Sequence, residues 1–237
     1  MHAPVAPPIP IKLLLQAYRA GVFPMADDRE DSEVFWVEPR ERAIFPLDGF
    51  HVSRSLAKAL RQDRFTVTCN AAFADVIAAC AAPRPDQPTS WISRRIEASY
   101  LALHRDGYAH SIECWRDGAL VGGLYGVAFD QVFCGESMFS RADNVSKVAL
   151  AWLVAAMRRG GYRLLDCQFM TGHLRSLGAV ALPQADYLKL LAQARAKPGL
   201  TIPQAIAAYQ ADGVSGSSAA GASSPGKLIA QSLTQTS

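Results

Sequence analysis

Three apolar segments that follow one another almost without a break constrain the fold of this chain more than any other feature. They cover residues 109–115, 119–129 and 131–138, and each has the length and composition of a β-strand. Asp117-Gly118 lies between the first two segments, and this dipeptide is typical of the tight turn of a β-hairpin. The sequence therefore predicts three consecutive strands arranged as a meander.

A long helix and one more strand are predicted directly after this meander. The helix covers residues 144–159 with a stripe of apolar positions, and Gly160-Gly161 ends it. The strand covers residues 163–168 and would rejoin the sheet. Strands in a meander, then a helix, then a strand that rejoins the sheet is the order of an acetyltransferase-like (GNAT-like) α+β fold, and generic α+β domains share this order.

The two ends of the chain differ from this central part. One helix and two short strands, over 35–37 and 42–45, are predicted in the first section, so residues 1–62 are expected to form a small N-terminal α+β domain. Residues 63–212 are expected to form the acetyltransferase-like domain. Residues 213–237 are rich in Gly, Ser and Ala and bury too little apolar area to offset their ordering entropy, so a disordered tail is expected.

Composition and charge limit the kinds of protein that this chain can be. Half of the residues are hydrophobic and 19% are charged, which is enough apolar material for a core, so a globally disordered chain is excluded. The chain has 24 Lys and Arg against 21 Asp and Glu, and its net charge of +3 is far below that of a protein that coats nucleic acid. Any contact with nucleic acid is therefore expected to be local.

Several signals that would indicate a membrane, a metal or a nucleotide are missing from the sequence. No apolar run reaches the roughly 18–20 residues that cross a bilayer, and the first residues lack a basic leader, so we expect a cytoplasmic protein with no membrane partner. The five cysteines are scattered without a C-x-x-C pair, so we expect neither a disulfide framework nor a metal site. No glycine follows Gly135 before the next helix, so a CoA donor is not expected.

Two polar residues at the end of the strand 163–168 are candidates for chemistry. Asp166 and Gln168 are two positions apart, so their side chains should project from the same face of a strand. Burying a carboxylate and an amide there without partners would cost several kcal/mol. The alternative interpretation is a strand end whose polar side chains lie at the surface.

Glu136 is the third candidate, because it follows the apolar residues 132–134 at the end of a predicted central strand. A buried glutamate needs a cationic partner. That partner is either Arg141, which would make the pair structural, or a cation of the substrate.

His110, Ser111 and Glu113 lie close together in sequence and resemble the components of a catalytic triad. A triad depends on a geometry that local spacing does not show, and no G-x-S-x-G elbow is present, so a strand histidine with a satisfied hydrogen bond is favoured. Trp36, Trp91 and Trp115 are each expected in the core, with stacking walls for a base or an apolar substrate as the alternative.

Several segments together resemble one enzyme family over residues 11–191. They include AYRAGVFPM (17–25), GYAHSIECW (107–115), FCGESMFSR (133–141) and LLDCQ (164–168), and the most specific parts are AHS-x-E-x-W, GESMFSR and DCQ in this order. They resemble the leucyl/phenylalanyl-tRNA–protein transferases, bacterial enzymes of the N-degron pathway. The resemblance implies a small N-terminal domain followed by an acetyltransferase-like catalytic domain.

The reaction that the resemblance implies needs no added cofactor. The family transfers Leu, Phe or, less readily, Met from aminoacyl-tRNA to the α-amine of a protein that begins with Arg or Lys. The ester bond of the donor is already activated, so neither ATP nor CoA is required, and no metal is implied. The expected partners are therefore the acceptor end of aminoacyl-tRNA and proteins with N-terminal Arg or Lys, which the transfer marks for degradation.

The resemblance also implies roles for particular residues. Asp166 and Gln168 match the catalytic pair, in which the carbonyl oxygen of Gln168 accepts a hydrogen bond from the attacking amine and Asp166 polarises the arrangement. Glu136 matches the acid that meets the basic side chain of the acceptor. Four further residues match positions around the donor, where the first two surround its 3′ end and the last two lie near the aminoacyl pocket: Trp36, Trp115, Met138 and Phe139.

One departure and two alternatives accompany this assignment. Met25 stands where the family often has tryptophan, which affects the expected choice between Leu and Phe. The first alternative is a peptidoglycan-bridge aminoacyltransferase, although 237 residues leave no room for the two acetyltransferase-like domains that such proteins usually have. The second is a catalytically silent tRNA-binding module.

Overall fold

The structure, a computed structural model, describes residues 6–83, 88–215 and 223–234 and consists of one large sheet with helices on both of its faces. The sheet has seven strands. In spatial order they are β4 (Thr66–Cys69), β5 (Ala109–Arg116), β6 (Ala119–Phe129), β7 (Val132–Ser140), β8 (Leu164–Gln168), β3 (Glu41–Phe45) and β9 (Val180–Pro183). A separate two-stranded sheet pairs β1 (Phe23–Met25) with β2 (Phe35–Val37).

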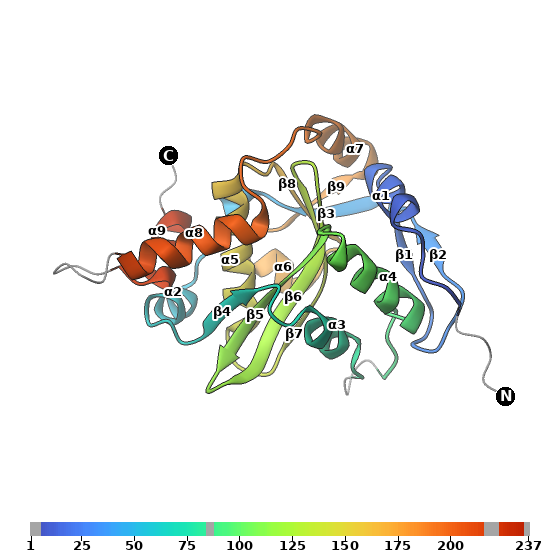
Figure 1. Ribbon diagram of the computed structural model, residues 1–237. Helices are drawn as coiled ribbons and strands as arrows, with labels where there is room; N and C mark the ends of the chain where they lie inside the picture. The colour runs from blue at the N-terminus through green and yellow to red at the C-terminus, as the bar shows by residue number, and fades with distance from the viewer. Residues whose placement is uncertain (1–5, 84–87, 216–222, 235–237) are drawn as a thin grey trace.

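The helices form a layer on each side of the large sheet (Figure 1). Two of them, α3 (Phe73–Ala81) and α4 (Arg94–Arg105), pack on one face, and α5 (Val145–Gly160) packs on the other. The remaining helical segments are α1 (Ile11–Arg19), η1 (Leu47–Gly49), α2 (Arg54–Arg61), α6 (Gly172–Ser176), α7 (Gln184–Gln193), α8 (Ile202–Ser215) and α9 (Pro225–Thr234). None of the helices in the described residues is long and apolar enough to cross a bilayer.

The predicted meander is confirmed, because β5, β6 and β7 pair in antiparallel fashion in sequence order. Asp117 and Gly118 form the turn of the first hairpin with φ angles of 51° and 77°. Such positive φ values at both central residues give the turn the twist that the two strands need. The predicted helix and the strand that rejoins the sheet are also present as α5 and β8.

Only a short stretch of β7 pairs with β8. The two strands run parallel and pair from Val132 and Leu164 to Cys134 and Asp166. Beyond this point, β7 continues to Ser140 while β8 ends at Gln168, and no further pairing joins them. The central sheet therefore divides at the positions where the candidate residues lie.

The expected boundary at residue 62 does not agree with the sheet. β3 was expected in the N-terminal domain, but it pairs with β8 on one side and with β9 on the other. α2 likewise packs against α5 and α9. Hydrogen bonds between distant strands decide this membership, and the local pattern of residues 41–45 contains no information about them.

The expectation of a disordered tail is wrong for the part of it that the structure describes. Residues 225–234 form the helix α9, which packs against α2, α5 and α8 and buries Ile229, Ala230 and Leu233. Gly226 allows this packing, since a Cβ atom there would lie 2.1 Å from the carbonyl oxygen of Leu60. The Gly/Ser/Ala composition concealed a short apolar face, and residues 216–222 and 235–237 lie outside the described residues.

Candidate active site

A cavity of about 940 Å³ opens where β7 and β8 separate. Residues 135–140 of β7 and Arg141 after it form one wall, and Leu150 and Leu153 of α5 contribute to another. Most of the lining side chains are apolar. Glu136 and Gln168 lie in the wall among them, so the cavity combines apolar surface with a carboxylate and a carboxamide.

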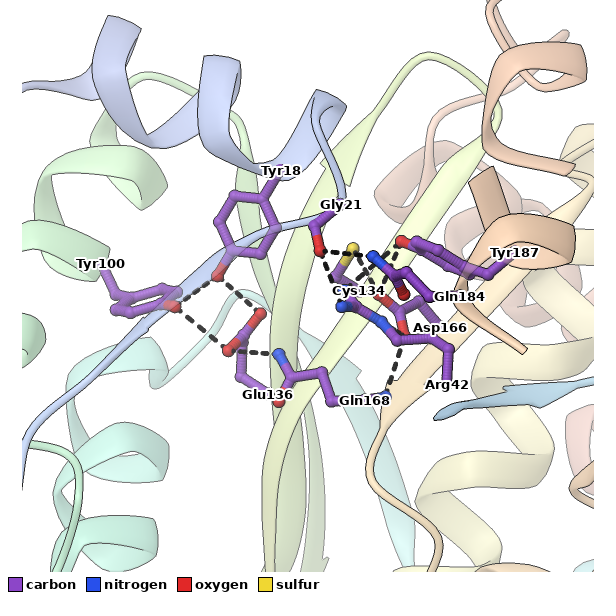
Figure 2. Close-up of polar contacts among 10 residues, drawn as sticks. All are labelled: Tyr18, Gly21, Arg42, Tyr100, Cys134, Glu136, Asp166, Gln168, Gln184 and Tyr187. Carbon is purple, nitrogen blue, oxygen red and sulfur yellow. Dashed lines mark hydrogen bonds and ion pairs between the residues drawn. The ribbon is translucent and has the colours of Figure 1, made fainter. Parts of the chain in front are cut away.

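Glu136 is buried, and its carboxylate is held by three neutral hydrogen-bond donors (Figure 2). The hydroxyl of Tyr18 donates to Oε1 at 2.7 Å. The hydroxyl of Tyr100 and the Nε2 of Gln168 donate to Oε2 at 3.1 Å and 3.0 Å. Burial raises the pKa of Glu136 to about 7, although these hydrogen bonds oppose the shift.

Arg141 is not the internal partner of Glu136, so the structural alternative for this glutamate is wrong. Its Nη1 donates to the carbonyl oxygen of Leu120 at 3.3 Å, and its guanidinium lies over the ring of Phe139, 5.2 Å from the centroid. Both residues line the cavity, but Arg141 follows the end of β7 at Ser140, where the contacts with Leu120 and Phe139 hold its guanidinium.

Asp166 is completely buried and lies in a network of five donors (Figure 2). The Nε of Arg42 donates to Oδ1 at 2.9 Å, and its Nη2 donates to Oδ2 at 2.6 Å. The hydroxyl of Tyr187 and the Sγ of Cys134 also donate to Oδ2, at 2.9 Å and 3.5 Å. The backbone N–H of Gln168 donates to Oδ1 at 2.8 Å. Burial opposes the charge on Arg42, but the bonds to Asp166 outweigh this and raise the pKa of Arg42.

The structure corrects both interpretations of the pair Asp166 and Gln168. The two side chains are not at the surface, and they do not project side by side. Gln168 has a φ of 60°, in the left-handed region that non-glycine residues rarely adopt. Its carboxamide therefore turns into the cavity toward Glu136, while Asp166 points away toward Arg42.

The four residues expected around the donor divide into two groups. Met138 and Phe139 line the cavity. Trp36 and Trp115 are not among its lining residues, because Trp36 lies exposed on β2 and Trp115 lies on β5, where its Nε1 donates to Thr68 at 2.8 Å. A contact of these two tryptophans with a donor remains a prediction.

Trp91 and Met25 line the cavity in their place. The expectation of a core position for Trp91 is therefore incomplete, and Met25 lies where the sequence departs from the family pattern. Neither position could be assigned from spacing alone, since the two residues are 66 positions apart and reach the cavity from different loops and strands.

His110, Ser111 and Glu113 do not form a triad. The hydroxyl of Ser111 donates to Glu113, which also accepts a bond of 2.6 Å from Thr68. The Nδ1 of His110 is 3.0 Å from the Nδ2 of Asn70, and burial lowers the pKa of His110 to about 4. His110 is therefore a neutral strand histidine with a satisfied hydrogen bond, as predicted.

Sequence reasoning missed the side chains that hold the two acids. Arg42 gave a signal that could have been used, because it is the one charged residue in the predicted strand 42–45 and a buried cation requires an anion. Tyr18, Tyr100 and Tyr187 gave no such signal, since tyrosines are common in helices that pack on a core. Among the residues that the structure describes, no group of three His, Cys, Asp or Glu side chains could hold a metal ion.

Comparison with known proteins places this chain among the aminoacyltransferases. The model of the family described as leucyl/phenylalanyl-tRNA protein transferase matches residues 44–192, and the model of its N-terminal domain matches residues 9–40. The chain belongs to the leucyl/phenylalanyl-tRNA–protein transferase family. The N-terminal model ends at residue 40, directly before β3, and the other begins at residue 44, within that strand.

Individual relatives agree with this family. A leucyl/phenylalanyl-tRNA–protein transferase from Novosphingobium aromaticivorans is 59% identical over 255 aligned positions that cover 97% of each chain. One from Rhizorhabdus wittichii is 62% identical over 179 positions, 76% of this chain and 72% of the relative. Among solved structures, L-PGS from Bacillus licheniformis aligns over 70% of this chain and 55% of its own, with 13% identity and a TM-score of 0.38.

Proposed function

We propose that this protein transfers Leu or Phe, and less readily Met, from aminoacyl-tRNA to the N-terminal α-amine of proteins that begin with Arg or Lys, which marks them for degradation. The proposal takes the donor and the reaction from the names of its relatives. The reaction would take place in the cytoplasm, where aminoacyl-tRNA is made. The specificity for the acceptor needs support from the site itself.

The observation that carries the proposal is the environment of Glu136. Its carboxylate is buried in the wall of the cavity, and its three hydrogen-bond donors among the described residues are all neutral. A buried carboxylate without a cation is costly, so a ligand that brings a positive charge to this position gains more than a neutral ligand does. The guanidinium of Arg or the ammonium of Lys has this charge.

The chemistry at the acceptor amine requires only modest help. An α-amine has a pKa of about 7.7–8.0, so a substantial fraction is neutral and nucleophilic near pH 7. Its nitrogen forms a bond to the ester carbonyl carbon of the donor, the bond from that carbon to the 3′ oxygen of the tRNA breaks, and the proton that the nitrogen loses is balanced by the one that the 3′ hydroxyl gains. The Nε2 of Gln168 donates to Glu136, which leaves its carbonyl oxygen to accept a hydrogen bond from the attacking amine.

The apolar part of the cavity supports the choice of donor. Met138, Leu150, Leu153 and Leu165 line it, and a leucyl or phenylalanyl side chain would bury apolar surface against them. The rest of the tRNA would remain outside the cavity, in agreement with the small net charge of the chain.

A transfer assay with matched peptides tests the proposal. Leu-, Phe- and Met-tRNA are offered with peptides that differ only in their first residue: Arg, its neutral isostere citrulline, Lys, its neutral isostere norleucine, and Asp. We expect transfer to the Arg and Lys peptides and a loss of at least tenfold with each isostere. Equal labelling of the Arg and citrulline peptides would contradict the role of Glu136. The absence of transfer in a single turnover would instead identify a silent tRNA-binding module.

A further inference from the structure

Asp166 cannot contact either substrate in this structure, although Gln168 of the same motif lines the cavity. Its side chain has no exposed area, and it is not among the residues that line the cavity. A carboxylate offers about four lone-pair positions, and the carboxylate of Asp166 already accepts bonds from five donors. Any effect of Asp166 on the reaction must therefore pass through another residue.

The backbone of Gln168 is the connection between Asp166 and the cavity. The Oδ1 of Asp166 accepts the N–H of Gln168 at 2.8 Å, which is the hydrogen bond of an Asx turn. This bond fixes the position of the backbone nitrogen of Gln168. The φ angle of Gln168, which begins at this nitrogen, is left-handed, a conformation that costs free energy unless the surroundings hold it. The same conformation directs the carboxamide of Gln168 to Glu136, with 3.0 Å between Nε2 and Oε2.

Arg42 fixes the orientation of Asp166 in turn. Its guanidinium binds both carboxylate oxygens, which sets the plane of the carboxylate as well as its distance. Nη1 donates to the carbonyl oxygen of Gly21 at 2.9 Å, and the rings of Phe23 and Tyr187 lie 4.8 Å and 4.4 Å from the guanidinium carbon. Arg42 is thus held by the turn after α1, by β1 and by α7, and it cannot rotate independently of them.

Tyr187 completes the arrangement from α7. Its hydroxyl donates to the Oδ2 of Asp166 at 2.9 Å and lies 3.4 Å from the Nη2 of Arg42, which donates to it. The carboxylate therefore has a fixed donor on each side. We propose that Arg42 and Tyr187 are positioning residues of the active site, which act through Asp166 on the backbone of Gln168 and so determine where its carboxamide lies.

This inference rests on the proposed function, because its test measures transfer. Tyr187→Phe is the informative variant, since it keeps the ring against Arg42 and removes only the hydroxyl, with its bond to Asp166 and the longer one from Arg42. We expect kcat to fall on the order of tenfold, because a small displacement of a reacting group has a large effect on rate. The KM values for donor and acceptor should stay within about twofold. Arg42→Lys, which keeps the charge but loses the two-point contact, should reduce kcat further.

A double-mutant cycle separates positioning from a general effect on the fold. If Tyr187 acts through Gln168, then Tyr187→Phe should have almost no further effect on kcat in a Gln168→Ala background. Leu233→Ala in α9 is the control, because it lowers stability at a residue that does not line the cavity and should leave kcat unchanged below its melting transition. The same fractional loss of kcat in both backgrounds, or an unchanged kcat in Tyr187→Phe, would overturn the inference. Failure of the proposed function is distinct, since the wild type itself would then show no transfer.

Discussion

Arg42 and Asp166 lie 124 positions apart in the chain and form a two-point ion pair in which neither side chain is exposed to solvent. The pair connects β3 to β8, two strands that are neighbours in the sheet. Asp166, a residue of the motif DCQ, is therefore a buried anion and not a surface acid. This position changes what a substitution at Asp166 is expected to do.

Asp166→Ala is expected to destabilise the fold as well as to stop transfer. The substitution leaves the charge of Arg42 buried without its partner, and breaking a buried pair in this way costs about 3–5 kcal/mol. Gln168→Ala leaves no unpaired cation and removes one hydrogen bond to Glu136, so its free energy of unfolding should fall by about 1.5–3 kcal/mol, less than that of Asp166→Ala, while transfer falls by one to three decades, roughly the range of positioned proton-transfer help. Urea unfolding of both variants at pH 7 measures the difference. A wild-type stability for Asp166→Ala would show that the buried pair does not exist in solution.

Glu136 should make the stability of the free protein fall as the pH rises toward neutrality. Burial raises its pKa to about 7 in the folded protein, against about 4.3 for an unfolded glutamate. Because the folded pKa is the higher of the two, the contribution of this group is complete below about pH 4 and is lost as the pH rises through 7. Relative to Glu136→Gln, the wild type should lose about 3 kcal/mol across this interval. Denaturant unfolding at several pH values checks this, and parallel profiles of the two proteins would contradict it.

The same glutamate should control the affinity for the acceptor and not the affinity for the donor. Glu136→Gln removes a charge-assisted hydrogen bond worth about 1.5–3 kcal/mol, so binding of an Arg-starting peptide should weaken roughly ten- to a hundredfold. Binding of aminoacyl-tRNA should be nearly unchanged, since it depends on the apolar wall of the cavity. Separate titrations of the two substrates measure this. A parallel loss of both affinities would defeat the role of Glu136 in reading the acceptor.

The C-terminal helix α9 should contribute to stability, contrary to the expectation of a disordered tail. Leu233 is buried against the core, so Leu233→Ala should cost about 2–5 kcal/mol. Gln231→Ala on the exposed side of the same helix is the matched control and should have little effect. Thermal unfolding of the two variants measures the difference. Equal melting temperatures would show that the helix does not dock on the core.

Tyr125→Phe should stabilise the protein. The hydroxyl of Tyr125 is buried, and no hydrogen-bond partner for it exists among the described residues. An unsatisfied buried polar group costs about 1–3 kcal/mol, and phenylalanine removes the group while keeping the ring. Tyr187→Phe provides the opposite case, because that hydroxyl donates to Asp166 and its loss should lower stability. If Tyr125→Phe also lowers the melting temperature, the hydroxyl of Tyr125 has a partner in solution.

Local patterns predicted the elements of the fold with good accuracy. The predicted hairpin at Asp117 and Gly118 is present, and serine, a residue type that commonly precedes helices, caps α2, where the hydroxyl of Ser53 accepts the N–H of Leu56 at 3.3 Å. These features depend on residues only a few positions apart, whose conformational preferences act in any context. The helix α8 and the helix α9 were missed, because their composition of small residues gave only a weak apolar stripe.

The sequence by itself determined the meander, the long helix, the strand that rejoins the sheet, and the motifs that carry Glu136, Asp166 and Gln168. The tertiary structure alone decided which partners these residues have. Tyr18 reaches Glu136 across 118 positions of the chain, and the φ of Gln168 separates its side chain from that of Asp166. Strand periodicity predicts the direction of a side chain only where the backbone is extended, and it does not identify the residues that the side chain contacts. The partners and the pKa of a buried acid depend on the segments that the fold packs around it.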